Sequence, residues 1–117
     1  MEKTIAWAKT AGLNTEEGLS YTAGDEDLYL EIVGDYAGEV EKRAEELEHN
    51  FMEGDMENFV IHVHALNSLS KTIGATEVFL LAMELEELGT DGDVEAVREK
   101  LPALLEAYRK LGEKLLN

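Results

Sequence analysis

The sequence predicts an all-α protein, an antiparallel four-helix bundle with a short N-terminal helical cap. Three observations favour this class. Apolar residues recur at steps of three and four along four long segments, the 117 residues include one proline, and aromatic residues make up 7% of the chain. Apolar residues at this spacing form one stripe along a helix. Short turns separate the four segments, so we expect consecutive helices to run antiparallel.

The first bundle helix is predicted from about Asp25 to about Phe51. Asp25 follows a glycine and suits an N-cap. Gly34 and Gly38 each weaken the middle of this helix by about 1 kcal/mol relative to alanine. Residues 53–55 (Glu-Gly-Asp) are typical of the turn that ends it. The positions predicted to face inward are Leu28, Ile32, Tyr36, Val40, Ala44, Leu47 and Phe51.

The second and third helices are predicted over about 55–73 and about 76–88. Gly74 separates them as a C-terminal glycine, where a left-handed residue costs no strain. Thr76 is a candidate N-cap for the third helix. The predicted inward positions are Phe59, His62, Leu66, Leu69 and Ile73 on the second helix, and Val78, Leu81, Ala82, Leu85 and Leu88 on the third.

The fourth helix is predicted from about Asp93 to Leu115, with a bend at Pro102 because the apolar periodicity continues past the proline. Its predicted inward positions are Val94, Val97, Leu101, Leu104, Tyr108, Leu111 and Leu115. Residues 1–24 carry a shorter apolar set, which predicts one or two short helices capping an end of the bundle formed by 25–117. We expect Trp7 to anchor this cap.

Composition excludes several classes of function. With 10 Lys and Arg against 26 Asp and Glu, the formal net charge is -16, which disfavours nucleic acids and anionic membrane surfaces as partners. The absence of cysteine excludes disulfides, thiolate nucleophiles and zinc–thiolate sites. No apolar run is long enough to cross a bilayer, and residues 1–20 do not resemble a signal peptide. The expected location is therefore the cytoplasm.

Two histidines on the second helix are predicted to differ in role. His62 and His64 are separated by about 200° around a helix. His62 falls on the apolar stripe and is interpreted as a core-edge histidine with a hydrogen-bonded ring. His64 falls on the other side, among Val60, Asn67, Ser68 and Lys71, and is expected to face solvent.

The distribution of charge singles out the side that carries His64. Residues 58–76 contain one charged residue, Lys71, in a strongly acidic chain. A surface that carries a phosphoryl group or meets an anionic partner has a reason to exclude carboxylates, because like charges repel. The alternative is a neutral face buried against another helix or a second subunit. The many glutamates elsewhere, including Glu84, Glu86 and Glu87, are interpreted as solvated helix faces.

The run from His64 to Ala75, HALNSLSKTIGA, resembles the signature of histidine-containing phosphotransfer (HPt) domains of bacterial two-component phosphorelays. The matching residues are His64, Leu66, Ser68, Ile73, Gly74 and Ala75. Residues 24–32 are similar to the segment that opens the first bundle helix of such domains, and residues 82–86 to their third helix. The resemblance covers roughly residues 12–116.

The resemblance implies that His64 accepts a phosphoryl group from the aspartyl phosphate of a response-regulator receiver and passes it to another receiver. The chain would then be a phosphotransfer intermediate and not a turnover enzyme. Asn67, Ser68 and Lys71 would surround the phosphoryl group, and Val60 and Ile61 would belong to the receiver-docking surface. The implied partners are receivers and a hybrid sensor kinase. The chain would act as a monomer without its own cofactor or metal, and the receiver would carry the Mg²⁺.

One residue departs from the family's pattern. Asn67 stands where these domains usually have lysine. Asparagine donates a hydrogen bond without charge, and charge-assisted bonds are about twice as strong. Lys71, nearly two turns from His64, is a candidate to compensate in part as a point charge. The alternative function is therefore a non-catalytic receiver-binding scaffold with impaired transfer.

Two other kinds of site are weakly indicated. A carboxylate-bridged metal bundle requires two Glu-x-x-His pairs facing inward, and the chain offers one such spacing, Glu46 to His49, off the apolar stripe. Ser68 and Ser70 lie on the same predicted helix as His62 and His64, but their spacing supports no Ser-His-Asp arrangement.

Overall fold

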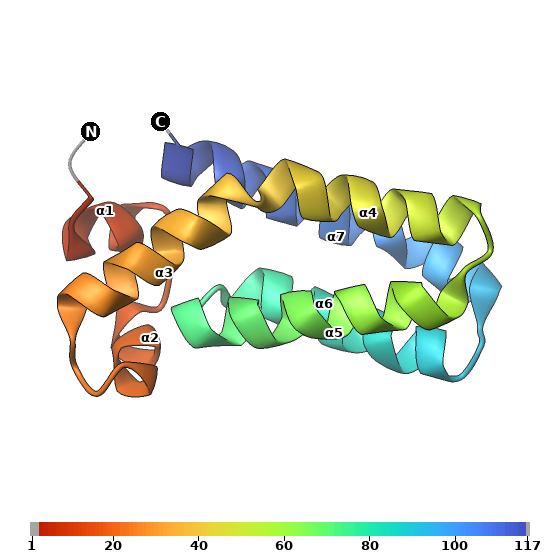
Figure 1. Cartoon of the computed structure of the whole chain (residues 1–117), viewed down its shortest axis with the longest axis horizontal. Helices are drawn as coiled ribbons and strands as arrows, with labels where there is room; N and C mark the ends of the chain where they lie inside the picture. The colour runs from red at the N-terminus through yellow and green to blue at the C-terminus, as the bar shows by residue number, and fades with distance from the viewer. Residues whose placement is uncertain (1–2, 117) are drawn as a thin grey trace.

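The computed structural model describes residues 3–116, a stretch built of α-helices joined by short turns (Figure 1). In chain order the helices are α1 (Ile5–Thr10), α2 (Thr15–Tyr21), α3 (Glu26–Gly38), α4 (Val40–Met52), α5 (Met56–Ile73), α6 (Thr76–Thr90) and α7 (Val94–Leu116). Residues 1, 2 and 117, the outer ends of the two predicted segments 1–24 and 25–117, lie outside the described residues.

The predicted all-α class is confirmed. α3 and α4 follow each other as one bent arm, and α5, α6 and α7 run back and forth beside it, so that five helices make the four arms of a bundle (Figure 1). α5 packs most closely on α6, which also packs on α7, while α4 contacts both α5 and α7. The two short helices α1 and α2 lie at one end of the bundle.

The prediction of one continuous first helix is wrong, because the chain breaks at Glu39. α3 ends at Gly38 and α4 begins at Val40. The N–H of Glu39 donates to the carbonyl of Tyr36 at 3.2 Å, and no side chain caps the start of α4. Gly34 and Gly38 lower the helix propensity of this stretch, which makes it the place where the arm can bend.

The predicted inward stripe is also wrong in the first turns of α3. Leu28 is 44% exposed, whereas its neighbour Tyr29 is fully buried, as is Val33. α2 packs against this side of α3, and a Cβ at Gly18 would overlap the ring of Tyr29. The hydroxyl of Tyr29 donates to the carbonyl of Ile73 at 2.8 Å. Contacts with the N-terminal helices therefore rotate the buried face by one residue.

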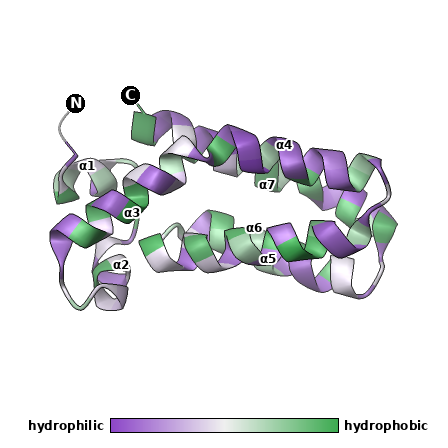
Figure 2. Cartoon of the chain, in the orientation of Figure 1, coloured by the Kyte–Doolittle hydropathy of each residue, from purple (hydrophilic) through white to green (hydrophobic). Residues whose placement is uncertain are grey.

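The rest of the predicted core is largely confirmed, with graded burial. Val94 is exposed, contrary to prediction, because it opens α7 beyond the packed interior. The remaining predicted inward positions are buried or half-buried, and those that are half-buried are Ile32, Phe51, His62, Leu69, Leu81 and Leu88. α7 continues through Pro102 without interruption. Figure 2 shows hydrophobic and hydrophilic residues alternating along the bundle helices, as amphipathic packing requires.

The predicted cap at Asp25 is confirmed, Asp55 also caps a helix, and the cap predicted at Thr76 is wrong. Asp25 accepts from the N–H of Leu28 at 3.0 Å, and Asp55 accepts from that of Asn58 at 3.1 Å. Thr76 was the predicted cap of α6, but it is the first residue of that helix. Ala75 holds the cap position without a side-chain bond, because alanine has no side-chain acceptor, and its N–H closes α5 on the carbonyl of Ser70 at 2.8 Å.

The corner between α5 and α6 is joined to the N-terminal cap. Gly74 has a φ of +79°, and a Cβ there would overlap the backbone carbonyl of Asn14. The N–H of Asn14 donates to the carbonyl of Gly74 at 2.8 Å. Glycine is thus required twice at this position, by its left-handed conformation and by the approach of a second chain segment.

α7 is fastened by polar contacts at two places, to the N-terminal cap and to α4. The indole Nε1–H of Trp7, a buried residue, donates to the carbonyl of Leu115 at 3.2 Å, so the expected anchoring role of Trp7 is confirmed. Arg109 of α7 contacts Glu41 and Glu48 of α4, with 2.8 Å from Nη2 to each carboxylate. No helix within residues 3–116 combines the length and apolar character needed to cross a bilayer.

Substituting alanine at Gly74 should lower the free energy of unfolding by more than about 3 kcal/mol, because backbone strain and steric overlap add. The matched control is Gly92→Ala. Gly92 has a similar φ of +73°, but a Cβ there meets nothing within 4 Å, so its cost should be about 1 kcal/mol. Urea unfolding followed by circular dichroism measures both. Equal costs for the two variants would contradict the packing role given to Gly74.

The bundle should lose stability between about pH 10 and pH 12. Burial raises the pKa of Tyr29 to about 12 and raises the pKa values of Tyr36 and Tyr108 further. Unfolded tyrosines ionise near pH 10, so above that pH the unfolded state binds fewer protons than the native state, and stability falls. Urea unfolding at pH 8 and pH 11 tests this. Tyr29→Phe should reduce the difference, whereas Tyr21→Phe, an exposed control, should leave it unchanged.

Candidate functional site around His64

His64 is presented outward from the middle of α5. Its side chain is 63% exposed, which confirms the expected solvent-facing orientation. The adjacent residues Val63 and Leu66 are fully buried. Their packing fixes the rotation of α5, so the imidazole stands on a rigid part of the bundle.

A carboxylate from α6 contacts the His64 ring. Oε2 of Glu86 lies 2.7 Å from Nδ1 of His64, and the Glu86 side chain is 26% exposed. The expectation of a surface free of carboxylates around His64 is therefore wrong. The near-absence of charge holds along residues 58–76, but the acidic group comes from the neighbouring helix.

Asn67 completes a three-residue cluster with His64 and Glu86. Its amide Nδ2–H donates to Oε1 of Glu86 at 3.0 Å. Each carboxylate oxygen of Glu86 thus has one partner on α5, and the half-buried Asn67 restricts the orientation of the carboxylate. The described contact of the Asn67 amide is therefore with Glu86.

Small residues on α6 allow the close approach that this cluster requires. Ala82 and Gly89, four residues before and three after Glu86, are buried on the side that faces α5. A Cβ at Gly89 would lie 2.9 Å from Cγ2 of Val60. Val60 is accordingly half-buried at the α5–α6 contact, while its neighbour Ile61 is 55% exposed. Of the two residues predicted for the docking surface, Ile61 is the one that is open.

The hydrogen bond to Glu86 determines the chemistry available to the ring. A carboxylate accepts hydrogen bonds, so Nδ1 of His64 is the donor in this contact. In the neutral imidazole the other nitrogen, Nε2, then carries a lone pair. The exposed imidazole is therefore arranged as a nucleophile through Nε2.

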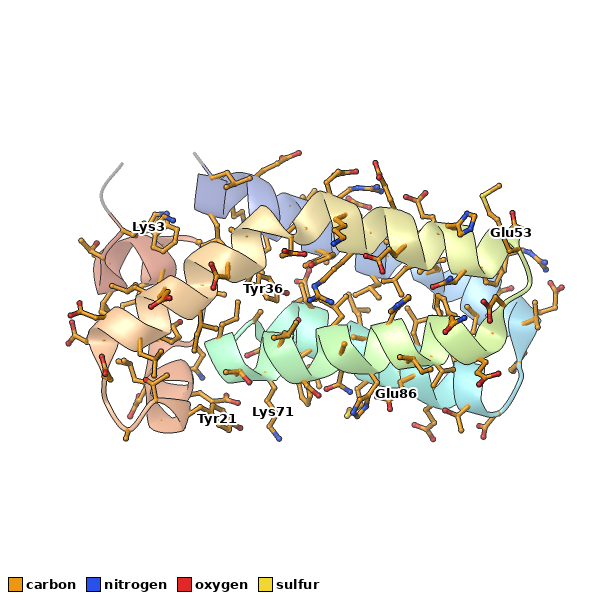
Figure 3. All side chains as sticks on the ribbon, viewed as in Figure 1. Lys3, Tyr21, Tyr36, Glu53, Lys71 and Glu86 are labelled. Carbon is orange, nitrogen blue, oxygen red and sulfur yellow. The ribbon has the colours of Figure 1, made fainter. Side chains whose placement is uncertain are left out.

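The other two residues predicted to surround a phosphoryl group are exposed on the same helix. Ser68 is followed one turn later by Thr72, whose hydroxyl donates to the Ser68 carbonyl at 2.9 Å. The Nζ of Lys71 lies 5.4 Å from the centroid of the Phe79 ring. Figure 3 shows Lys71 and Glu86 along the same edge of the α5–α6 pair. Lys71 and Glu86 thus place a cation and a carboxylate on this edge.

His62 occupies a different environment on the opposite side of α5. Its Nδ1 lies 2.7 Å from Oδ1 of Asn50, and its Nε2 lies 3.4 Å from Oε2 of Glu46. The half-buried ring fits the predicted core-edge histidine with a hydrogen-bonded ring. Among residues 3–116 no three His, Asp or Glu side chains gather in a way that could hold a metal ion.

Glu86 is the residue of the cluster that sequence reasoning missed. It had been grouped with Glu84 and Glu87 as part of a solvated face. One signal distinguishes it, because Ala82 and Gly89 flank it on one side of the helix. Small residues at these steps indicate a close helix–helix contact, and a glutamate between them is brought to the partner helix.

Comparison with protein-family models shows that residues 31–114 match the Hpt domain. Searches of curated proteins and of solved structures returned no significant match. The matched segment includes His64, Asn67 and Glu86, and it spans α4, α5 and α6 and most of α3 and α7. Hpt domains transfer phosphoryl groups through a histidine in phosphorelays and interact with receiver domains. The chain belongs to the Hpt domain family.

Proposed function

We propose that this domain is a phosphorelay carrier, in which Nε2 of His64 accepts a phosphoryl group from the aspartyl phosphate of one receiver and passes it to another. The observation that carries the proposal is the geometry of a single ring. The His64 side chain is 63% exposed, and its Nδ1 lies 2.7 Å from the carboxylate of Glu86. An open imidazole whose Nε2 has a lone pair can approach phosphorus in line.

In the forward step, the Nε2 lone pair forms a bond to phosphorus as the bond from phosphorus to the aspartyl oxygen breaks. The oxygen leaves as a carboxylate and takes the bonding electrons. The proton on Nδ1 stays on the ring, where the carboxylate of Glu86 balances the positive charge that develops. The reverse step returns the phosphoryl group to an aspartate of the second receiver. The receiver is expected to supply the Mg²⁺.

The surroundings of His64 suit the docking of another protein domain. Ile61 lies one turn before His64 on α5, and Met83 lies one turn before Glu86 on α6. Both are exposed apolar side chains. We assign them to the receiver-docking surface, with Val60 supporting Ile61 from the α5–α6 contact. The proposal places this exchange in the bacterial cytoplasm, with a monomeric chain and with receivers and a hybrid sensor kinase as partners.

A second candidate function is receiver binding without transfer. Two observations favour it. Asn67 takes the place of the family's usual lysine and is engaged by Glu86, and the nearest cation on the same face, Lys71, is nearly two turns from His64 and lies over Phe79. A phosphoryl group on His64 would then lack a cation supplied by its own helix.

Phosphorylation of His64 is tested by incubating the protein with purified receiver domains that carry radiolabelled aspartyl phosphate. We expect acid-labile, base-stable label on the protein, and we expect His64→Gln to reduce it by at least about a hundredfold, because glutamine offers no imidazole nitrogen to attack phosphorus. His49→Gln is the matched control, since His49 is also exposed but lies at the end of α4.

Equal labelling of the His64→Gln variant and the parent chain would contradict the proposed site. The scaffold function predicts a different result. In that case a receiver would bind both the parent chain and His64→Ala with the same affinity, and no label would move. Calorimetric titration alongside the transfer assay separates the two functions.

The hydrogen-bonded form of His64 is tested by nuclear magnetic resonance. With the protein labelled with ¹⁵N on histidine, the ring nitrogens of neutral His64 should show a protonated Nδ1 and an unprotonated Nε2, because Glu86 accepts from Nδ1. Glu86→Ala should shift His64 toward the tautomer mixture that we expect for exposed His49. An Nε2-protonated ring in the parent chain would contradict the assignment.

A further inference from the structure

The cluster of His64, Glu86 and Asn67 differs from a site that stores a phosphoryl group. A storage site is expected to surround the phosphoryl oxygens with cations. Here the side chain at position 67 is uncharged and donates to Glu86 at 3.0 Å, and the one charged group in contact with the ring is a carboxylate, 2.7 Å from Nδ1. The polar contacts are therefore made to the imidazole.

We propose that Glu86, oriented by Asn67, makes a phosphoryl group on His64 short-lived, by stabilising the ring form that carries a proton on Nδ1. This inference rests on the proposed phosphorylation of Nε2. In this cluster Glu86 acts on the reacting ring, and Asn67 is a positioning residue that acts through Glu86.

The chemistry follows from the leaving group. When the phosphorylated ring carries a proton on Nδ1, breaking the P–Nε2 bond returns the electron pair to Nε2 and releases a neutral imidazole. Without that proton the same cleavage would release an imidazolide anion, which is a far poorer leaving group. The attacking atom is a carboxylate oxygen of a receiver or the oxygen of water. With water, the products are inorganic phosphate and the original ring, and the water gives up one proton.

The charged groups around the ring are few. α6 is the helix packed against the side of α5 that carries His64, and it contributes Glu86. Glu84, two residues earlier, pairs with Lys100 of α7 and so faces away from α5. On α5 itself the nearest cation is Lys71, beside Phe79 of α6. Glu86 is thus the charged group in direct contact with His64 among the described residues.

The test needs no receiver. The full-length chain is phosphorylated on histidine with potassium phosphoramidate, the reagent is removed, and loss of phosphohistidine is followed by ³¹P magnetic resonance from pH 5 to pH 9. We expect Glu86→Gln to lengthen the half-life at pH 7 about threefold to tenfold and to move the midpoint of the pH profile to lower pH, since a neutral amide stabilises a protonated ring less than a carboxylate does. Glu87→Gln is the matched control, an exposed neighbour with no ion pair to the described residues.

Asn67→Ala gives a second, independent measurement. It removes the bond that orients Glu86 and keeps the carboxylate, so the half-life should rise by a smaller factor than in Glu86→Gln. Identical pH profiles for the parent chain, Glu86→Gln and Asn67→Ala, with His64 phosphorylated in all three, would overturn this inference and leave the proposed function standing. Failure of phosphoramidate to modify His64 in the folded parent chain would overturn both.

Discussion

The left-handed turn at Gly74 is the constraint on which the arrangement of the bundle depends. It reverses the chain between α5 and α6, and two other segments are fitted to it. The backbone of Asn14 meets the Gly74 carbonyl at 2.8 Å, and the hydroxyl of Tyr29 meets the adjacent carbonyl of Ile73 at the same distance. Because the turn is fixed from outside as well as by its own conformation, α5 and α6 leave it in one defined register. That register brings Glu86 opposite His64.

This strongly acidic chain places the exposed His64 in a nearly neutral region. The charge of -16 is spread over solvated faces of the helices, while the side of α5 around His64 is nearly neutral. One carboxylate lies in this region, and small residues on α6 bring it to Nδ1 of the ring. Electrostatic effects fall off steeply with distance and exposure, so the position of this one group matters more to the ring than the net charge of the whole chain.

Sequence periodicity predicted the class of fold, the four arms and most of the buried positions, because amphipathic packing leaves its period in the sequence. It failed where a contact between distant segments decides the outcome. Tyr29 is buried in place of Leu28 because α2 covers that side of α3. Glu86 was assigned to solvent because its partner lies 22 residues earlier on another helix. The exposed imidazole at position 64 was predictable from its helical phase, whereas the carboxylate that contacts its Nδ1 was not.

The tie between Trp7 and the end of α7 has a practical consequence. Trp7 is the one tryptophan in the chain, and its indole is buried where the N-terminal helix meets the Leu115 carbonyl. Its fluorescence emission therefore reports specifically on whether this end of the molecule is closed. Comparing the emission spectrum with the circular dichroism of the long helices shows whether the contact between Trp7 and the Leu115 carbonyl opens before the four arms separate. The alternative is that both are lost together in one cooperative transition.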